Sequence, residues 1–89
     1  MEFEWDERKA RANWRKHRVD FADAATIFED ERAMILAEEN PEEERYVTIA
    51  KDPLGRVLVV VHTIRSDRIR IISARRATSR ECAEYEQAL

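Results

Sequence analysis

Seven arginines fall between positions 56 and 80 of this 89-residue chain, and the one acidic residue in that window is Asp67. The window therefore has a formal charge of +6. The remaining residues hold nine lysines and arginines against eighteen acids, a charge of −9, and the whole chain is at −3. A planar guanidinium donates paired hydrogen bonds to phosphate oxygens and stays charged at physiological pH. The segment is therefore expected to bind phosphate locally, although the chain as a whole is acidic.

The spacing of this segment predicts how its side chains meet. A three-residue loop at 65–67 would pair Ile64 with Arg68 and would place His62 opposite Arg70, with Cβ atoms about 5 Å apart. Arg75 and Arg76 follow where the strand ends and the chain enters its last helix. Because helix N-termini attract anions, we expect the arginine pair and this helix start to converge on one phosphate.

Two interpretations of the same residues stay open on pattern alone. Arginines that alternate with isoleucines also occur on any solvated strand face, and this chain has acids to pair with them. A single histidine such as His62 is more often structural than catalytic, and Glu81 fits a helix cap better than a general base. Trp5 and Trp14 fit packing roles better than base-stacking roles.

Several classes of protein are excluded or disfavoured by composition. Gly55 is the sole glycine, so a phosphate-binding P-loop is excluded. Cys82 is the sole cysteine, which leaves neither an internal disulfide nor zinc ligands at a workable spacing. The charged N-terminus has no apolar signal region, and the longest apolar run, residues 57–61, is too short to span a bilayer. We expect a cytoplasmic protein without cofactor, metal or membrane contact.

The elements that must position the arginines follow from periodicity and capping residues. Asp6 and Asp20 are suited to cap two successive helices. Thr78 and Glu81 have the spacing of a capping box at the start of the last helix, where Cys82, Tyr85 and Leu89 would form an apolar stripe. Strands are expected around Phe3 and over residues 33–37, 45–50, 56–64 and 68–74, with the strand over 56–64 central. The sequence thus predicts one domain over residues 1–89, an α+β fold with an antiparallel sheet and the order β-α-α-β-β-β-β-α.

Short sequence blocks occur in a fixed order along nearly the whole chain. The segment "FEWDERKARANWRKHRVDFADAATIFED", with W-D, K-x-x-x-N, K-H and F-x-x-A-x-x-x-F in order, resembles the opening of the BrnT family of toxins. The blocks "RYVTIA", "GRVLVVVHT", "RIRIISARRAT" and "E…YE" resemble the rest, from Phe3 to Glu86. Two departures stand out: Arg18 follows Lys16-His17 where the family usually has glycine, and the last segment has fewer basic residues.

The resemblance implies a small ribonuclease toxin of a type II toxin–antitoxin pair, similar in fold to the RelE-like toxins. It implies a BrnA-type antitoxin as partner, in a complex of two toxins and two antitoxins, with DNA bound only through the antitoxin. We expect acidic residues of the antitoxin to cover the arginine-rich face, because opposite charges steer association. The alternatives are a non-catalytic module that binds RNA or protein, and an inactive toxin that only binds antitoxin.

Roles for individual residues follow from the chemistry of RNA cleavage, in which the 2′-OH attacks the adjacent phosphorus without a metal. Arginines stabilise the extra charge, and an imidazole can transfer a proton near neutral pH. The candidate catalytic residues are therefore His62, Arg70, Arg75 and Arg76, with Glu81 as a reserve base. Candidate RNA- and phosphate-binding residues are Arg45, Arg65, Arg68 and Arg80.

Overall fold

The computed structural model describes residues 1–40 and 42–87. Its elements follow the expected order and confirm the α+β class. They are β1 (Glu2–Glu4), α1 (Glu7–His17), α2 (Phe21–Thr26), a 3₁₀ turn η1 (Ile27–Glu29), β2 (Met34–Glu38), β3 (Arg45–Lys51), β4 (Val57–Arg65), β5 (Arg68–Arg76) and α3 (Ser79–Gln87).

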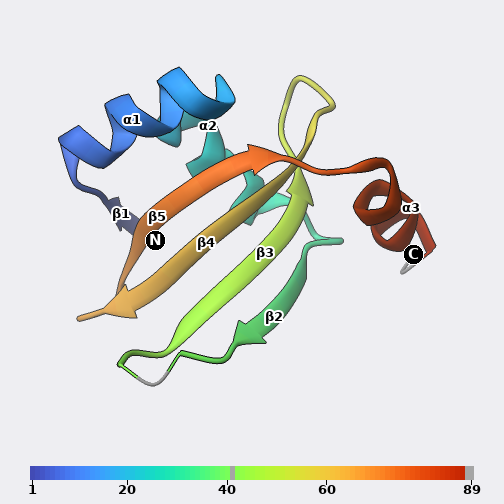
Figure 1. Ribbon diagram of the computed structural model, residues 1–89. Coiled ribbons are helices and arrows are strands. Elements are labelled where there is room, and N and C mark those ends of the chain that lie inside the picture. Colours follow the sequence, from blue (N-terminus) through green and yellow to red (C-terminus); the bar gives the residue numbers. More distant parts are fainter. Residues whose placement is uncertain (41, 88–89) are drawn as a thin grey trace.

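The five strands form one sheet in the order β1-β5-β4-β3-β2 (Figure 1). Strand β4 lies in the middle, as its run of aliphatic residues predicts for a strand covered on both faces. Strands β2 to β5 are antiparallel, but β1 runs parallel to β5, with Phe3 opposite Ile69. The expectation of an antiparallel sheet is therefore wrong at this edge, and the sheet is mixed.

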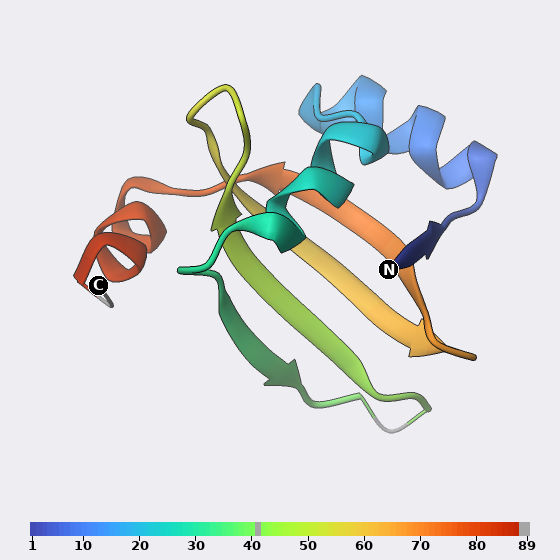
Figure 2. The ribbon, with the colours of Figure 1, turned by 180° about the vertical axis from the view of Figure 1, so that it is seen from behind.

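The two faces of the sheet are covered differently. Helix α2 lies over one face and α1 runs along the β5 edge beside it (Figure 2), and Phe21, Ile27 and Leu58 are fully buried on this side. On the other face Tyr85 of α3 packs against Ile49 and Val59, toward one end of the strands. We call the rest of this second face the open face. Tyr85 confirms part of the expected stripe on α3, whereas Leu89 lies outside the described residues.

The caps expected from the sequence are present. The Asp6 side chain accepts hydrogen bonds from the backbone amides of Arg8 and Lys9, and Asp20 accepts one from the amide of Ala22. At the start of α3 the amide of Thr78 donates to the Glu81 carboxylate at 2.9 Å, and the amide of Glu81 donates to the Thr78 hydroxyl at 3.2 Å. These reciprocal bonds satisfy backbone donors that the helix itself leaves free.

The hairpin between β4 and β5 differs from its predicted register. Arg65 pairs with Arg68 across a two-residue turn, in which Ser66 and Asp67 both have positive φ angles of 48° and 67°. The expected three-residue loop and the Ile64–Arg68 pair are therefore wrong. A turn of this kind usually has glycine, but Asp also tolerates the left-handed region. Because no glycine marks this turn, the sequence pattern does not predict it.

A β-bulge shifts the register again further along the hairpin. Val61 pairs with Ser73 and His62 pairs with Ile71, so Ile72 is the extra residue in β5. His62 consequently faces the helices, whereas Arg70 pairs with Thr63 on the open face. The predicted pairing of His62 with Arg70 is wrong, because the turn and the bulge together change which residues are opposite.

Asn13 fixes α1 beside the β5 edge just past this bulge. Its Nδ2 donates to the carbonyl of Ala74 at 2.8 Å and to that of Val19 at 3.0 Å, and its Oδ1 accepts from the amide of Ala74 at 3.0 Å. The side-chain amide therefore acts as a strand partner where the short β1 has ended. The side of α1 that carries Asn13 is thereby held against β5.

Candidate functional site

The structure separates the three arginines that were expected to share one phosphate. Arg70 and Arg75 lie on the open face, because they pair with Thr63 and Val59. Arg76 pairs with Leu58 of the helix-covered core and so belongs to the opposite face. Adjacent strand residues point to opposite faces, and five residues of strand span roughly 16 Å. The expected convergence of Arg70, Arg75 and Arg76 on one ion is therefore wrong for this conformation.

Most arginines singled out from the sequence are paired with a nearby acid. Their partners are Glu43 for Arg45 at 2.9 Å, Glu4 for Arg70 at 2.7 Å, Glu81 for Arg75 at 2.8 Å, Glu2 for Arg68 at 3.0 Å and Glu84 for Arg80 at 3.5 Å. Arg65 and Arg76 have no ion pair within residues 1–40 and 42–87. The open face therefore has less free positive charge than the sequence suggests, although Arg45, Arg70 and Arg75 do share it.

Arg75 is the most firmly oriented of these side chains. Its Nη1 and Nη2 donate to the two Glu81 oxygens at 2.8 and 2.9 Å. The hydrogen bonds and charge of Arg75, with the amide of Thr78, lower the pKa of Glu81 from 4.5 to about 2 in spite of its burial. A carboxylate that holds its proton so weakly is a poor base at neutral pH. Glu81 thus caps α3 and orients Arg75, and its geometry gives no support to the reserve-base role.

His62 lies on the helix-covered face, away from Arg70 and Arg75. Its ring packs edge-on against Phe28 at 4.8 Å, and Nε2 shares a 2.7 Å hydrogen bond with the Thr48 hydroxyl. The side chain is 4% exposed, and burial lowers its pKa from 6.5 to about 4. A neutral imidazole beneath the helices cannot reach a substrate on the open face. This placement gives no support to the proton-transfer role.

A hollow of about 240 Å³ lies between α1 and the β5 bulge. Its lining includes Lys9, Lys16 and the half-buried His17 from α1, with Ile72 and Ser73 from β5. Neither lysine forms an ion pair with any part of the chain that the structure describes. This cluster was not predicted from the sequence. Its signal is the helical spacing of positions 9, 13, 16 and 17, which share one side of α1.

Ser73 connects this hollow to the arginines of the open face. It pairs with Val61 on the open face between Arg70 and Arg75, and it also lines the hollow. Backbone hydrogen bonds from Lys9 and Arg8, and then the charges of Lys9 and Arg70, lower the pKa of Asp6, so both cations lie near the start of α1. We call this cluster the Ser73 site; it comprises Lys9, Lys16, His17, Arg70, Ser73 and Arg75.

The residue types of the Ser73 site suit an anion. The site contains four cationic side chains, a hydroxyl and an imidazole, and cations of this kind stabilise charge on a phosphoryl group. Within the described residues, no three His, Cys, Asp or Glu side chains are grouped to hold a metal ion, and no helix is long and apolar enough to cross a membrane. These residue types are the ones that bind phosphate and exchange protons in proteins.

Comparison with known proteins gives the family to which this domain belongs. Residues 5–81 match the family described as "Ribonuclease toxin, BrnT, of type II toxin-antitoxin system", and the chain therefore belongs to the BrnT family. It is similar to the 1.1 Å crystal structure of the Brucella abortus ribonuclease toxin BrnT, with a TM-score of 0.69 and 26% identity. That match covers 89% of this chain and 99% of the Brucella chain. Among curated proteins, no relative matches the sequence significantly.

Proposed function

We propose that this chain is an active endoribonuclease toxin that cleaves RNA at the Ser73 site. Membership in the BrnT family supports the class of reaction. The proposed location of the active site rests on one observation. Ser73 lies between Arg70 and Arg75 in β5 and also lines the hollow of Lys9, Lys16 and His17. This cluster joins phosphate-binding cations to a side chain that can exchange protons, and both are needed for cleavage.

The proposed reaction needs no metal or cofactor. The 2′-oxygen of the RNA bonds to the adjacent phosphorus, the bond from phosphorus to the 5′-oxygen breaks, and a 2′,3′-cyclic phosphate and a 5′-hydroxyl result. The 2′-OH loses one proton, and the leaving 5′-oxygen gains one. His17 accepts the proton of the 2′-OH, and a water molecule donates a proton to the leaving 5′-oxygen. Arg75 and the two lysines stabilise the charge that develops on the phosphoryl oxygens, and Arg70, roughly 16 Å from Arg75 along β5, binds another phosphate of the RNA.

The proposed partner is a BrnA-type antitoxin, in a complex of two toxins and two antitoxins. Family membership in a type II system supports an antitoxin partner. The free toxin is proposed to act in the cytoplasm on RNA, and DNA is contacted only through the antitoxin. Inhibition requires that the bound antitoxin blocks access to the Ser73 site, either directly or by holding the toxin in an unproductive position.

The function can be tested with purified protein, a labelled single-stranded RNA and EDTA. We expect cleavage products that end in 2′,3′-cyclic phosphate. A DNA strand of the matching sequence should stay intact, because it lacks the attacking 2′-oxygen. The same assay with added ribosomes covers a ribosome-dependent activity. Intact RNA under all conditions would contradict the proposal.

A non-catalytic module is the second candidate, and one observation favours it. Arg70 and Arg75 already have acidic partners, Glu4 and Glu81, which reduces the charge available for catalysis. Such a module would bind the labelled RNA or an antitoxin without cutting the RNA. A chain that binds antitoxin, leaves RNA intact and does not arrest growth would be an inactive toxin.

A further inference from the structure

The cations of α1 are divided between two flanks of the helix. Lys9 and Lys16 line the hollow at the β5 bulge, whereas the arginines lie on the flank away from it. At 100° per residue, Arg8, Arg11 and Arg15 occupy one sector of the helix surface, and Arg18 follows as the C-cap. We call the set of Arg8, Arg11, Arg15 and Arg18 the arginine stripe; all four are exposed.

The arginine stripe differs from the open face in its pairing. None of its four members forms an ion pair anywhere in residues 1–40 or 42–87, whereas Arg45, Arg70 and Arg75 each have an acidic partner. An unpaired cation attracts an external anionic group without first losing an internal partner. The stripe is therefore better suited than the open face to attract an acidic protein.

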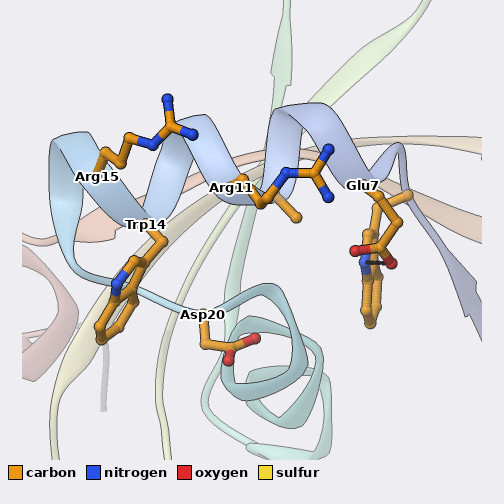
Figure 3. A pocket seen from close by; sticks show the side chains of 7 residues that line it. Glu7, Arg11, Trp14, Arg15 and Asp20 are labelled. Carbon is orange, nitrogen blue, oxygen red and sulfur yellow. Dashed lines mark hydrogen bonds between the residues drawn. The ribbon is translucent and has the colours of Figure 1, made fainter.

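A groove of about 470 Å³ lies beside the stripe, between Trp5 and Trp14. Ala10 lines the groove between them, and Arg11 and Arg15 project from the same helix (Figure 3). Trp14 is 47% exposed, which is unusual for the largest apolar side chain. An apolar groove next to unpaired arginines can accept an apolar side chain and bind acidic residues beside it.

The groove fits a protein better than RNA. Glu7 and Asp20 also line it (Figure 3), and their carboxylates would repel any anion inside the groove, so the groove itself suits a neutral side chain rather than a phosphodiester. Trp5 packs edge-on against Phe21 at 6.0 Å, and the Arg18 guanidinium lies 5.6 Å from the centre of the Trp14 ring. Stacked nucleobases need free ring faces. Exposed tryptophan and arginine are, in contrast, the residue types that dominate protein–protein binding energy.

We propose that this surface docks an acidic amphipathic helix of the antitoxin. An apolar side chain of that helix occupies the groove between Trp5 and Trp14, and its carboxylates contact the arginine stripe. This inference rests on the proposed function, because it names the docking surface of the antitoxin. It also replaces the expectation that the antitoxin's acids cover the open-face arginines, which have acidic partners within the chain.

The test uses the protein encoded by the gene adjacent to that of this chain as the antitoxin. Its affinity for toxin variants is measured at low and high salt. The variants are Trp14→Ala and the double change Arg11→Glu with Arg15→Glu. The matched control is Arg65→Glu with Arg68→Glu, which makes the same charge change at the tip of the β4–β5 hairpin. Circular dichroism and thermal unfolding check that all variants fold.

We expect both α1 variants to weaken binding about 30-fold or more, and the double variant to lose most of the salt dependence. The control should bind within about threefold of wild type, and both α1 variants should cleave RNA like wild type. Equal binding by wild type and α1 variants, or an equal loss in the control, would overturn the inference while leaving the ribonuclease proposal intact. Lost cleavage with unchanged antitoxin affinity would assign the groove to RNA. If the adjacent protein does not bind wild type, both the partnership and this inference fail.

Discussion

Arg75 and Glu81 are joined by two hydrogen bonds of 2.8 and 2.9 Å, which connect the end of β5 to the first turn of α3. The same carboxylate accepts a hydrogen bond from the amide of Thr78. One acidic residue therefore orients an arginine of the Ser73 site and caps the helix that follows it. This link places a stability determinant at the edge of the proposed active site.

Replacement of Glu81 by glutamine should make stability less dependent on pH. The folded-state pKa of Glu81 is about 2, below its ordinary 4.5, so its contribution is fully present above pH 4.5 and is lost as the pH falls through about 2. Because Arg75 is 40% exposed, solvent screening limits the effect. We expect Glu81→Gln to cost about 1–2 kcal/mol at pH 7 and little at pH 2, measured by urea unfolding.

Glutamine can keep the hydrogen bonds of the capping box but has only one acceptor oxygen, so this comparison isolates the pairing with Arg75, namely the charge of Glu81 and one of its two hydrogen bonds to that arginine. If wild type and Glu81→Gln differ by the same amount at both pH values, the ion pair with Arg75 does not stabilise the fold. The hydrogen bonds between the two side chains would then contribute nothing to the free energy of unfolding.

The two histidines should respond oppositely to the same substitution. His17 lines the hollow beside Ser73, whereas His62 is buried beneath the helices. We expect His17→Gln to lower the cleavage rate by roughly 100-fold at unchanged stability. His62→Gln should instead lower the free energy of unfolding while the rate per folded molecule stays within about threefold. Single-turnover RNA cleavage and denaturant unfolding measure the two quantities.

The pH dependence of stability gives a second readout for His62. Burial holds its folded-state pKa near 4, below the ordinary 6.5, so the unfolded chain binds a proton first and stability falls as the pH drops from 6.5 to 4. His62→Gln should lack this component. A His62→Gln variant that folds normally but cleaves 100-fold more slowly would restore His62 as the proton-transfer group.

Arg18 occupies a backbone position that favours glycine. It ends α1 with φ 58° and ψ 32°, in the left-handed region, and its amide donates to the carbonyl of Trp14. Arg18→Gly should be more stable than Arg18→Ala by about 1 kcal/mol, because both lose the contact with the Trp14 ring and only glycine avoids the backbone strain. Thermal unfolding of the two variants measures the difference, and equal stability would show that this turn stores no strain.

The sequence predicts the parts of this fold that depend on local chemistry. Helix starts are predictable because capping needs a specific side chain at a specific position, as at Asp6, Asp20 and the Thr78–Glu81 pair. The five aliphatics of β4 predict a central strand. The BrnT resemblance, which family comparison confirms, depends on such short blocks in a fixed order.

The sequence does not predict features that depend on distant contacts. The Ser66-Asp67 turn has no glycine, and the bulge at Ile72 leaves no mark in the residue pattern, so the predicted partner of His62 is wrong. The Ser73 site forms because Asn13 holds α1 against the β5 edge, sixty-one residues away in the chain. Which acids pair with Arg70 and Arg75 is likewise decided by tertiary structure.

Arg75 and Arg76 provide the most direct test of the proposed active site, because they are adjacent in β5 but belong to opposite faces of the sheet. Arg75→Gln and Arg76→Gln remove the same charge one residue apart. The measurement is the single-turnover rate of RNA cleavage in EDTA, with folding checked by circular dichroism. The proposal predicts a loss of about 100-fold or more for Arg75→Gln and a rate within about threefold of wild type for Arg76→Gln. Equal losses in both variants, or a larger loss for Arg76→Gln, would contradict a catalytic site on the open face.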